Sequence, residues 1–274
     1  MVVSALTDRF RQLHASDTFI LPNPWDLGSA RYLEWRGFPA VATTSSGFAS
    51  TLGRNDQHVT RDELLAHVEL LAGGLGIPVT VDAERCYADD LAGVAETVRL
   101  LADAGAAGCS IEDYNPATGR IDDLAIAVER VAAAAGEAAM HELVLTARTE
   151  RHLYEQLRGP AALDGTIERL IAFREVGAEV VYAPGLIELD DIARVVDEVG
   201  VPVNVLAMPA APSVGELASV GVRRVSTGGA LTWAAYGGLA SAVDELLDGG
   251  TSTYLTAAVP ARCRSQFLGT ELSG

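Results

Sequence analysis

The sequence predicts an α/β protein folded as a closed (β/α)8 barrel, or TIM barrel. Eight short β-type runs recur at intervals of roughly 20–40 residues, and amphipathic helical patterns separate them. Strands that alternate with helices form a parallel sheet, and a count of eight favours a closed barrel over an open doubly wound sheet. No Gly-x-Gly-x-x-Gly pattern follows the first run, which weakens a dinucleotide-binding alternative further. The eight runs are Phe19–Pro22, Ala40–Thr44, Pro78–Asp82, Gly108–Glu112, Leu143–Ala147, Glu179–Ala183, Pro202–Leu206 and Arg224–Thr227.

The segments between these runs carry helix signals. Thr60–Glu63 is a capping box, which predicts that a helix begins there. Ala92–Ala104 and Leu189–Val199 repeat apolar residues at the spacing of one buried helix face. Gly105 and Gly200 stand where these two helices should end, because glycine adopts left-handed dihedral angles without strain.

The length of 274 residues suits a single barrel of this kind, which typically takes about 250. No linker, repeat or low-complexity segment divides the chain, so one domain is expected over residues 1–274, with its core at about 19–247. Residues 248–274 are expected to form a C-terminal helical arm. Within that arm, Tyr254–Phe267 is either a short helix or a segment packed on a neighbouring subunit.

Composition argues against several classes of protein. The formal net charge is −17, and no basic stripe is present to displace counterions from nucleic acid. No uncharged apolar run approaches the roughly 18 residues that span a membrane, and the N-terminus lacks a signal-peptide pattern. The 3 cysteines have no paired spacing, which disfavours a disulfide scaffold or a zinc site. The sequence therefore predicts a soluble cytoplasmic protein without nucleic-acid or membrane partners.

Acidic side chains stand at the ends of two neighbouring runs. Asp82 and Glu84, which strand alternation would place on one face, end the third run, and Glu112 ends the fourth. In a barrel the carboxyl ends of the strands form the active-site face. Mg²⁺ prefers oxygen ligands and keeps several waters, so one direct carboxylate suffices if other acids act through water. The alternative is a pair of loop acids neutralised by Arg85, but the acid on the adjacent run favours a metal site.

Basic and polar groups end three other runs. The planar guanidinium of Arg148 suits a substrate carboxylate or phosphate, and an ion pair with Glu112 or Glu150 is the structural alternative. The two roles of this arginine can coexist. Thr43–Phe48 can present backbone N–H groups to an anion, although Ser/Thr/Gly clusters are usually only turns. Asn204 would lie at the same face of the barrel.

At these residues the chain resembles the isocitrate lyase/phosphoenolpyruvate mutase family, from about Phe19 to Leu247. The motifs that carry the resemblance are specific only in combination. They are Leu21–Asp26, Ala42–Gly47, Val81–Arg85, Ile111–Asp113, Thr146–Thr149, Pro202–Leu206 and Arg223–Ser226. The resemblance implies a (β/α)8 barrel that binds Mg²⁺ and a small 2-oxo or 2-hydroxy carboxylate, or its phosphonate relative.

The resemblance also implies roles for the acids. Asp82 matches the direct metal ligand of the family, and Glu84 and Glu112 match acids that hold metal-bound waters. Asp56 taken alone is more typical of a solvated loop acid, but it matches an outer acid near the metal. The expected ion is Mg²⁺, with Mn²⁺ as an alternative.

For the substrate, the resemblance implies two contacts. Arg148 matches the arginine that holds the substrate and stabilises developing enolate charge. Backbone N–H groups of Ser46, Gly47 and Phe48 match the loop that binds the substrate carboxylate. Members of the family are usually homo-oligomers that exchange a C-terminal helix, so a homodimer or homotetramer is expected.

The chain departs from both branches of the family. The lyase branch carries a Lys-[Lys/Arg]-Cys-Gly-His loop after the fourth strand, whereas Asp113–Arg120 contains no lysine, cysteine or histidine. Tyr114 replaces the lysine of the Glu-Asp-Lys sequence that is usual in the mutase branch. Cys86 and Ala88 replace two glycines after the third strand, and Tyr182–Gly185 lacks the histidine of the mutases.

The retained groups predict a Mg²⁺-dependent C–C bond lyase or decarboxylase that acts on a small 2-oxo or 2-hydroxy carboxylate through an enolate. Water, Tyr114 or a group not identified from the sequence would return the proton. One alternative is P–C bond chemistry, as in a phosphonomutase, a carboxyphosphonoenolpyruvate mutase-like enzyme or a phosphonopyruvate hydrolase. Another is a barrel that binds a metabolite without catalysis. Glycine and proline in segment 113–122 would permit it to close as a lid.

Overall fold

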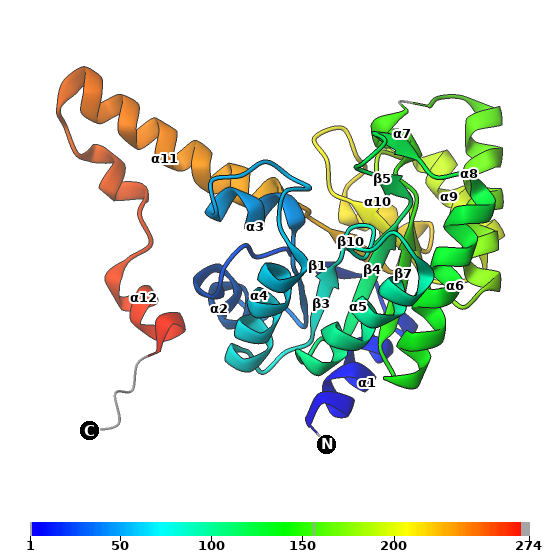
Figure 1. The fold of residues 1–274 in the computed structure, drawn as a ribbon. Helices are drawn as coiled ribbons and strands as arrows, with labels where there is room; N and C mark the ends of the chain where they lie inside the picture. The colour runs from blue at the N-terminus through cyan, green and yellow to red at the C-terminus, as the bar shows by residue number, and fades with distance from the viewer. Residues whose placement is uncertain (1, 156, 270–274) are drawn as a thin grey trace.

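Eight parallel strands form a nearly closed barrel at the centre of the protein (Figure 1), which confirms the predicted fold. The computed structural model describes residues 2–155 and 157–269, and residues 270–274 of the predicted arm lie outside this range. Neighbouring strands follow the order β1-β10-β9-β8-β7-β4-β3-β2, and Ala42 N–H donates to Pro22 O at 3.0 Å across the remaining seam. The strands are β1 (Phe19–Leu21), β2 (Val41–Ala42), β3 (Val79–Asp82), β4 (Gly108–Glu112), β7 (Val144–Arg148), β8 (Val180–Tyr182), β9 (Val203–Leu206) and β10 (Arg224–Ser226).

Each predicted run overlaps one of these strands, with ends that differ by at most two residues; β7 extends one residue past its run, to Arg148. The largest difference is at β2, because Thr44 leaves the sheet and caps the next helix, where its Oγ1 accepts a hydrogen bond from Gly47 N–H at 3.2 Å. Between β4 and β7 the chain adds an antiparallel hairpin of β5 (Tyr114–Asn115) and β6 (Arg120–Ile121). This hairpin was not predicted.

Helices cover the outside of the barrel. The predicted capping box is confirmed, since Thr60 Oγ1 and the Glu63 side chain accept each other's backbone N–H at the start of α4 (Arg61–Gly74). α9 (Leu189–Val199) has the predicted bounds and ends at Gly200, whose φ of 70° favours glycine. The other outer helices are α2 (Leu27–Trp35), α3 (Ser45–Thr51), α5 (Leu91–Asp103), α6 (Leu124–Met140), α7 (Arg151–Tyr154), α8 (Pro160–Glu175) and α10 (Val214–Ser219).

Helix α1 (Val2–Ala15) covers the amino-terminal end of the barrel (Figure 1). Phe10 is fully buried there in an apolar cluster with Phe19 and Val144. His14 is also buried, and its Nδ1 lies 2.9 Å from Phe10 O. Apolar packing thus closes this end, so a ligand would reach the barrel interior from the carboxyl ends of the strands.

The C-terminal segment leaves the barrel. Helix α11 (Ala230–Gly249), orange in Figure 1, extends away from the body of the protein. It is followed by a 3₁₀ helix, η1 (Thr253–Ala257), and by α12 (Ala261–Leu268), so the tail is helical as predicted. It leaves the barrel at Ala230, however, earlier than the predicted start of the arm at residue 248, because α11 continues past the last strand without packing back on the barrel. Phe267 of α12 packs against Tyr32 of α2 at 5.2 Å between ring centroids. Within residues 2–155 and 157–269, no helix combines the length and apolar character needed to cross a membrane.

Candidate active site

A cavity of about 160 Å³ lies inside the carboxyl end of the barrel. Its wall includes Asp82 from β3, Ser110 from β4, Arg148 from β7 and Tyr182 from β8. These side chains belong to four neighbouring strands of the sheet, so residues far apart in the sequence converge on one space. This is the position at which (β/α)8 barrels carry their active sites.

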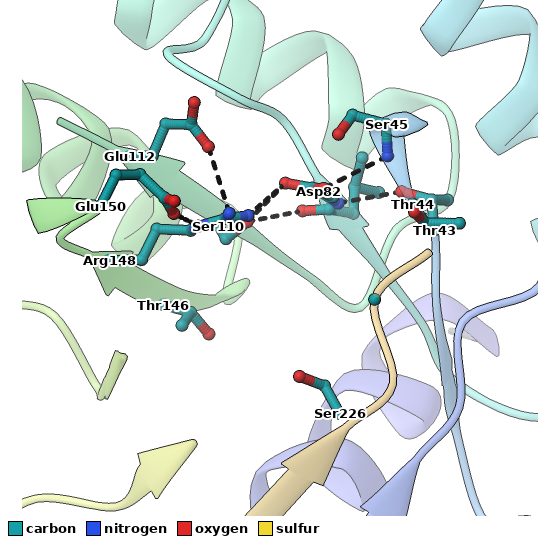
Figure 2. A network of polar contacts seen from close by, with 12 residues as sticks. Thr43, Thr44, Ser45, Asp82, Ser110, Glu112, Thr146, Arg148, Glu150 and Ser226 are labelled. Atoms are coloured by element: carbon teal, nitrogen blue, oxygen red, sulfur yellow. Dashed lines mark hydrogen bonds and ion pairs between the residues drawn. The ribbon is translucent and has the colours of Figure 1, made fainter. Parts of the chain in front are cut away.

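The centre of the site is Arg148, whose guanidinium contacts three carboxylates (Figure 2). Its Nη1 lies 2.9 Å from Asp82 Oδ1, and its Nη2 lies 3.5 Å from Glu112 Oε2. Its Nε donates to Glu150 Oε1. Both structural partners considered for Arg148, Glu112 and Glu150, are therefore present, and the ion pairs place the guanidinium at the cavity.

Asp82 is held in place by its neighbours on two strands. Its backbone N–H donates to Thr43 Oγ1 at 2.9 Å, while its Oδ2 accepts from Ser45 N–H at 3.2 Å. Ser110 Oγ, on the adjacent strand, lies 3.4 Å from Asp82 Oδ1 (Figure 2). These bonds fix one carboxylate at the edge of the cavity, which is what a direct metal ligand requires.

Glu84 reaches the site by a different route from the one expected. Strand β3 ends at Asp82, and the following loop is left-handed at Glu84, Cys86 and Tyr87, with φ of 47°, 62° and 52°. Strand alternation therefore does not place Glu84, and the loop does. Its Oε1 is buried and has no hydrogen-bond partner among the described residues. Burial, together with the charge of Asp82, raises the pKa of Glu84 to about 8.

Two further acids complete the group. Glu112 is buried, and its Oε1 accepts from Gln57 Nε2 at 3.0 Å. Burial raises the pKa of Glu112 well above its usual range, although the charge of Arg148 opposes this. Asp56 borders the cavity, where desolvation of its carboxylate and the charge of Asp82 raise its pKa. The residue as a whole is exposed, so it remains a solvent-accessible loop acid that borders the site.

This donor set fits a hard divalent cation. Three carboxylates contact the Arg148 guanidinium, and Asp56 and Glu84 are close enough to interact with it electrostatically. One buried carboxylate oxygen among the described residues, Glu84 Oε1, lacks a partner. Within the described ranges no three His, Cys, Asp or Glu side chains could hold one ion directly. One direct carboxylate with other acids acting through water agrees with both observations. Arg85 does not neutralise this group, because it pairs with Asp122 at 2.8 Å.

The predicted substrate loop is organised as the first turn of α3. Ser46 lines the cavity. Gly47 N–H donates to Thr44 Oγ1 at 3.2 Å and Phe48 N–H donates to Thr44 O at 2.9 Å, so both N–H groups are engaged in helix capping. The Phe48 ring stacks on His67 with 3.9 Å between centroids. Binding of a substrate carboxylate by this turn stays a prediction, with Ser46 at the cavity wall.

Tyr114 lies on the hairpin and stacks on Tyr154 of α7 at 3.8 Å between ring centroids. The base of the hairpin is fixed, because Arg169 Nη1 donates to Asp113 Oδ2 at 3.0 Å and Asp122 N–H donates to Asp113 O at 2.8 Å. The hairpin tip, residues 116–119, is exposed. A lid motion of segment 113–122 stays a prediction, and these contacts would limit it to the tip.

The structure adds contacts and residues that the sequence did not assign to the site. Glu150 was considered as an ion-pair partner of Arg148, but only the fold shows that its buried carboxylate orients the Nε of that arginine. Tyr182 lies with its ring 5.3 Å from the Arg148 guanidinium carbon. Gln57 fixes Glu112, as described above. Asn204 was predicted, and it lines the cavity from β9.

Comparison with known proteins is consistent with this geometry. Residues 10–247 match the family model described as phosphoenolpyruvate phosphomutase. A solved structure from Burkholderia cenocepacia J2315, described as a candidate lyase or mutase, is 43% identical, covers 98% of each chain and gives a TM-score of 0.93.

Two relatives have named activities. The 2-methylisocitrate lyase of Escherichia coli K12 is 31% identical over 187 residues, which are 64% of this chain and 61% of that protein. The oxaloacetate decarboxylase of Paraburkholderia xenovorans LB400 is 29% identical over 216 residues, 74% of this chain and 69% of that protein. Because the family model covers most of the chain, including the arginine and the acids around it, the protein belongs to the isocitrate lyase/phosphoenolpyruvate mutase superfamily and is an enzyme of its lyase type.

Proposed function

We propose that the protein is a Mg²⁺-dependent lyase that breaks a C–C bond in a small 2-oxo or 2-hydroxy carboxylate. The observation that carries this proposal is the position of Arg148, 2.9 Å from Asp82 at the wall of a cavity that Asp56 also lines, with Glu112 and Glu150 paired to the same guanidinium. The arginine can stabilise negative charge, and the acids can hold a cation beside it. The named activities of the lyase and decarboxylase relatives support this class of reaction.

In this proposal Asp82, Glu84 and Glu112 hold the metal ion, Mg²⁺ or Mn²⁺. When bound, the ion supplies Lewis-acid polarisation of the 2-oxo group. Arg148 stabilises the negative charge that develops on that oxygen as the bond breaks. Glu150 keeps the guanidinium in one orientation, since it accepts from its Nε. Ser46 contacts the substrate carboxylate at the cavity wall.

The stacked pair of Tyr114 and Tyr154 is the candidate source of the proton that returns to carbon. Burial and the charge of Glu112 raise the pKa of Tyr154 above its usual range, so its hydroxyl stays protonated at neutral pH. Tyr114 lies in direct stacking contact with it. Either hydroxyl can donate without a histidine or cysteine on this loop.

P–C bond chemistry is the second candidate function, because the matching family model is named for a phosphomutase. Tyr114 stands where that branch usually has a lysine, so a transferred phosphoryl group would lose a cationic partner at this position. Phosphonopyruvate therefore belongs in the substrate panel, but the proposed reaction is C–C cleavage.

A homo-oligomer is also proposed, as a dimer or tetramer. Helix α11 carries exposed apolar side chains along one stripe, including Trp233, Leu239 and Leu247. An exposed stripe of several large apolar side chains is typical of a protein interface. Exchange of α11 between neighbouring subunits would cover the stripe.

The test is pyruvate release from oxaloacetate, methylisocitrate and phosphonopyruvate, each measured with Mg²⁺ and with EDTA. Phosphate release and a coupled assay for phosphoenolpyruvate distinguish the two P–C reactions. Asp82→Asn removes the proposed metal ligand, and Asp89→Asn, an exposed acid in the same loop, is the matched control. Metal-dependent C–C cleavage that is lost only in Asp82→Asn supports the proposal. Full activity of Asp82→Asn or activity in EDTA contradicts it.

A further inference from the structure

The floor of the cavity holds a second arginine. Arg224, on β10, is 4% exposed and lines the same cavity as Asp82 and Arg148. It is the first residue of its strand, so its side chain lies deeper in the barrel than Ser226, two residues further along the same strand.

The side-chain contacts of this guanidinium are with neutral groups of the described residues. Nε donates to Asn204 Oδ1 at 2.9 Å, and Nη2 donates to Thr146 Oγ1 at 3.1 Å. Nη1 lies 3.3 Å from Nε2 of His14. An arginine carries five N–H hydrogens, so two remain beyond these three contacts.

His14 does not supply a compensating charge. Its Nδ1 lies 2.9 Å from Phe10 O, so that nitrogen carries the hydrogen and Nε2 accepts from Arg224. Burial and the charge of Arg224 lower the pKa of His14 to about 3, so the ring is neutral at physiological pH. Burial also lowers the pKa of Arg224, to about 10, and no carboxylate in the described part of the chain opposes this. The guanidinium is therefore still a cation at neutral pH.

A buried cation without an anion is costly. Two other arginines of this barrel show the usual solution: Arg85 pairs with Asp122 at 2.8 Å and Arg169 pairs with Asp113 at 3.0 Å. Arg224 differs because its uncompensated charge borders a cavity rather than solid packing. An anionic group of a ligand would neutralise it.

Arg224 is within reach of a ligand bound at Arg148. Thr146 and Arg148 are two residues apart on β7, about 7 Å at roughly 3.3 Å per residue, and Arg224 bonds to Thr146. Figure 2 shows Thr146 just below Arg148, and Ser226 below the level of Asp82. Ser226 Oγ accepts a hydrogen bond from Asn204 Nδ2 at 2.9 Å. Polar side chains therefore line the cavity from Ser226 down to Arg224, which also bonds to Asn204. Both arginines line one cavity of about 160 Å³, which is the size of a small-molecule site.

We propose that Arg224, with Ser226 beside it, binds a second carboxylate of the substrate, which is therefore a dicarboxylate. This inference rests on the proposed function for the first carboxylate, at the acid cluster. A guanidinium stabilises a carboxylate as the anion, so the group held by Arg224 is kept and is not the one that a decarboxylation would release. The subsite thus favours cleavage of a C–C bond between the two carboxylates over loss of the carboxylate at this end as CO₂.

The experiment measures ligand binding by calorimetry with Mg²⁺, so that it does not depend on turnover. Two pairs of ligands are compared: malate with 2-hydroxybutyrate, and 2-hydroxyglutarate with 2-hydroxyvalerate. Within each pair the only difference is that a methyl group replaces one carboxylate. Oxalate, which is too short to reach the floor, reports the acid cluster alone. In the wild-type protein the dicarboxylate of at least one pair should bind about tenfold tighter or more, the usual gain from a hydrogen bond to a charged group.

Variants assign this preference to Arg224. Arg224→Gln should reduce the ratio of dicarboxylate affinity to monocarboxylate affinity to about one and leave oxalate binding unchanged. Arg224→Lys should retain part of this preference. Arg174→Gln, an arginine that donates to Val199 O away from this cavity, is the control. If Arg224→Gln does not fold, the wild-type ratios still decide.

A wild-type ratio near one at both chain lengths overturns the inference, whatever substrate the enzyme cleaves. So does a ratio that persists in a folded Arg224→Gln variant. Dicarboxylate preference without C–C cleavage on any substrate supports the subsite and contradicts the proposed function. Loss of all binding, oxalate included, contradicts both.

Discussion

Replacing Arg148 by lysine tests the centre of the proposed mechanism. The guanidinium contacts Asp82, Glu112 and Glu150 through three different nitrogens, and an ammonium group on a flexible stem cannot reproduce these three directions. The charge remains, but its position relative to the reacting oxygen does not. Removal of one well-placed donor of this kind typically costs about 2.7–4 kcal/mol, or roughly 10²–10³ in kcat.

The metal site should respond differently. Asp82 and Glu112 keep their carboxylates in Arg148→Lys and lose a tightly held cationic partner, so Mn²⁺ affinity should stay equal or increase. The assay is steady-state kinetics on the best substrate of the panel, together with Mn²⁺ binding by electron paramagnetic resonance. Arg99→Lys, at an exposed ion pair on α5, is the matched control and should change neither quantity. A kcat for Arg148→Lys within tenfold of the wild type would refute the role assigned to this arginine.

Three further predictions concern assembly, pH and packing. Trp233→Glu combined with Leu239→Glu should convert the proposed oligomer into a folded monomer, because both side chains are exposed on α11. Light scattering measures the mass, and a mass equal to that of a wild-type oligomer would contradict the proposed interface. The pKa of His14 is lowered to about 3 in the folded protein, so on acidification this histidine is protonated in the unfolded chain before it is protonated in the folded one. The free energy of unfolding therefore falls as the pH drops below about 6.5, by about 1.4 kcal/mol per pH unit. The free energy of unfolding, measured by urea at pH 6.5 and at pH 5, should fall by roughly 2 kcal/mol less in His14→Gln than in the wild type. An equal fall in the two proteins would disprove this. Gly47→Ala would place a Cβ 2.5 Å from two side chains and should destabilise the folded protein by about 1–3 kcal/mol. Gly73→Ala, where a Cβ would have nothing within 4 Å, should not destabilise it. Equal melting temperatures of the two variants would contradict the packing argument.

The sequence predicted the barrel well because its signals were periodic and local. Gly108–Glu112 and Leu189–Val199 were predicted with the bounds that the structure shows, since each combines a regular apolar pattern with a clear stop. The acids and Arg148 could be located for the same reason: they end strands, and strand ends in a barrel share one face. Glu84 was expected near Asp82 and lies there, but its placement depends on left-handed loop residues that no periodicity describes.

The remaining part of the site depends on which way single side chains point. Arg223 and Arg224 are adjacent, so strand alternation sends one outward and one inward, but a basic pair at the start of a short run does not reveal which. In the fold Arg223 Nη1 donates to Ser16 O near α1, while Arg224 enters the barrel and meets Asn204. The choice follows from register, because Arg224 aligns with Asn204 on β9 and with Phe19 on β1. A one-residue shift would turn Arg223 and Val225 into the barrel and turn Arg224 out toward the helix layer, into which Val225 packs here. The apolar alternation of β10 therefore places the second cation in the cavity, and charge patterns alone could not have located it.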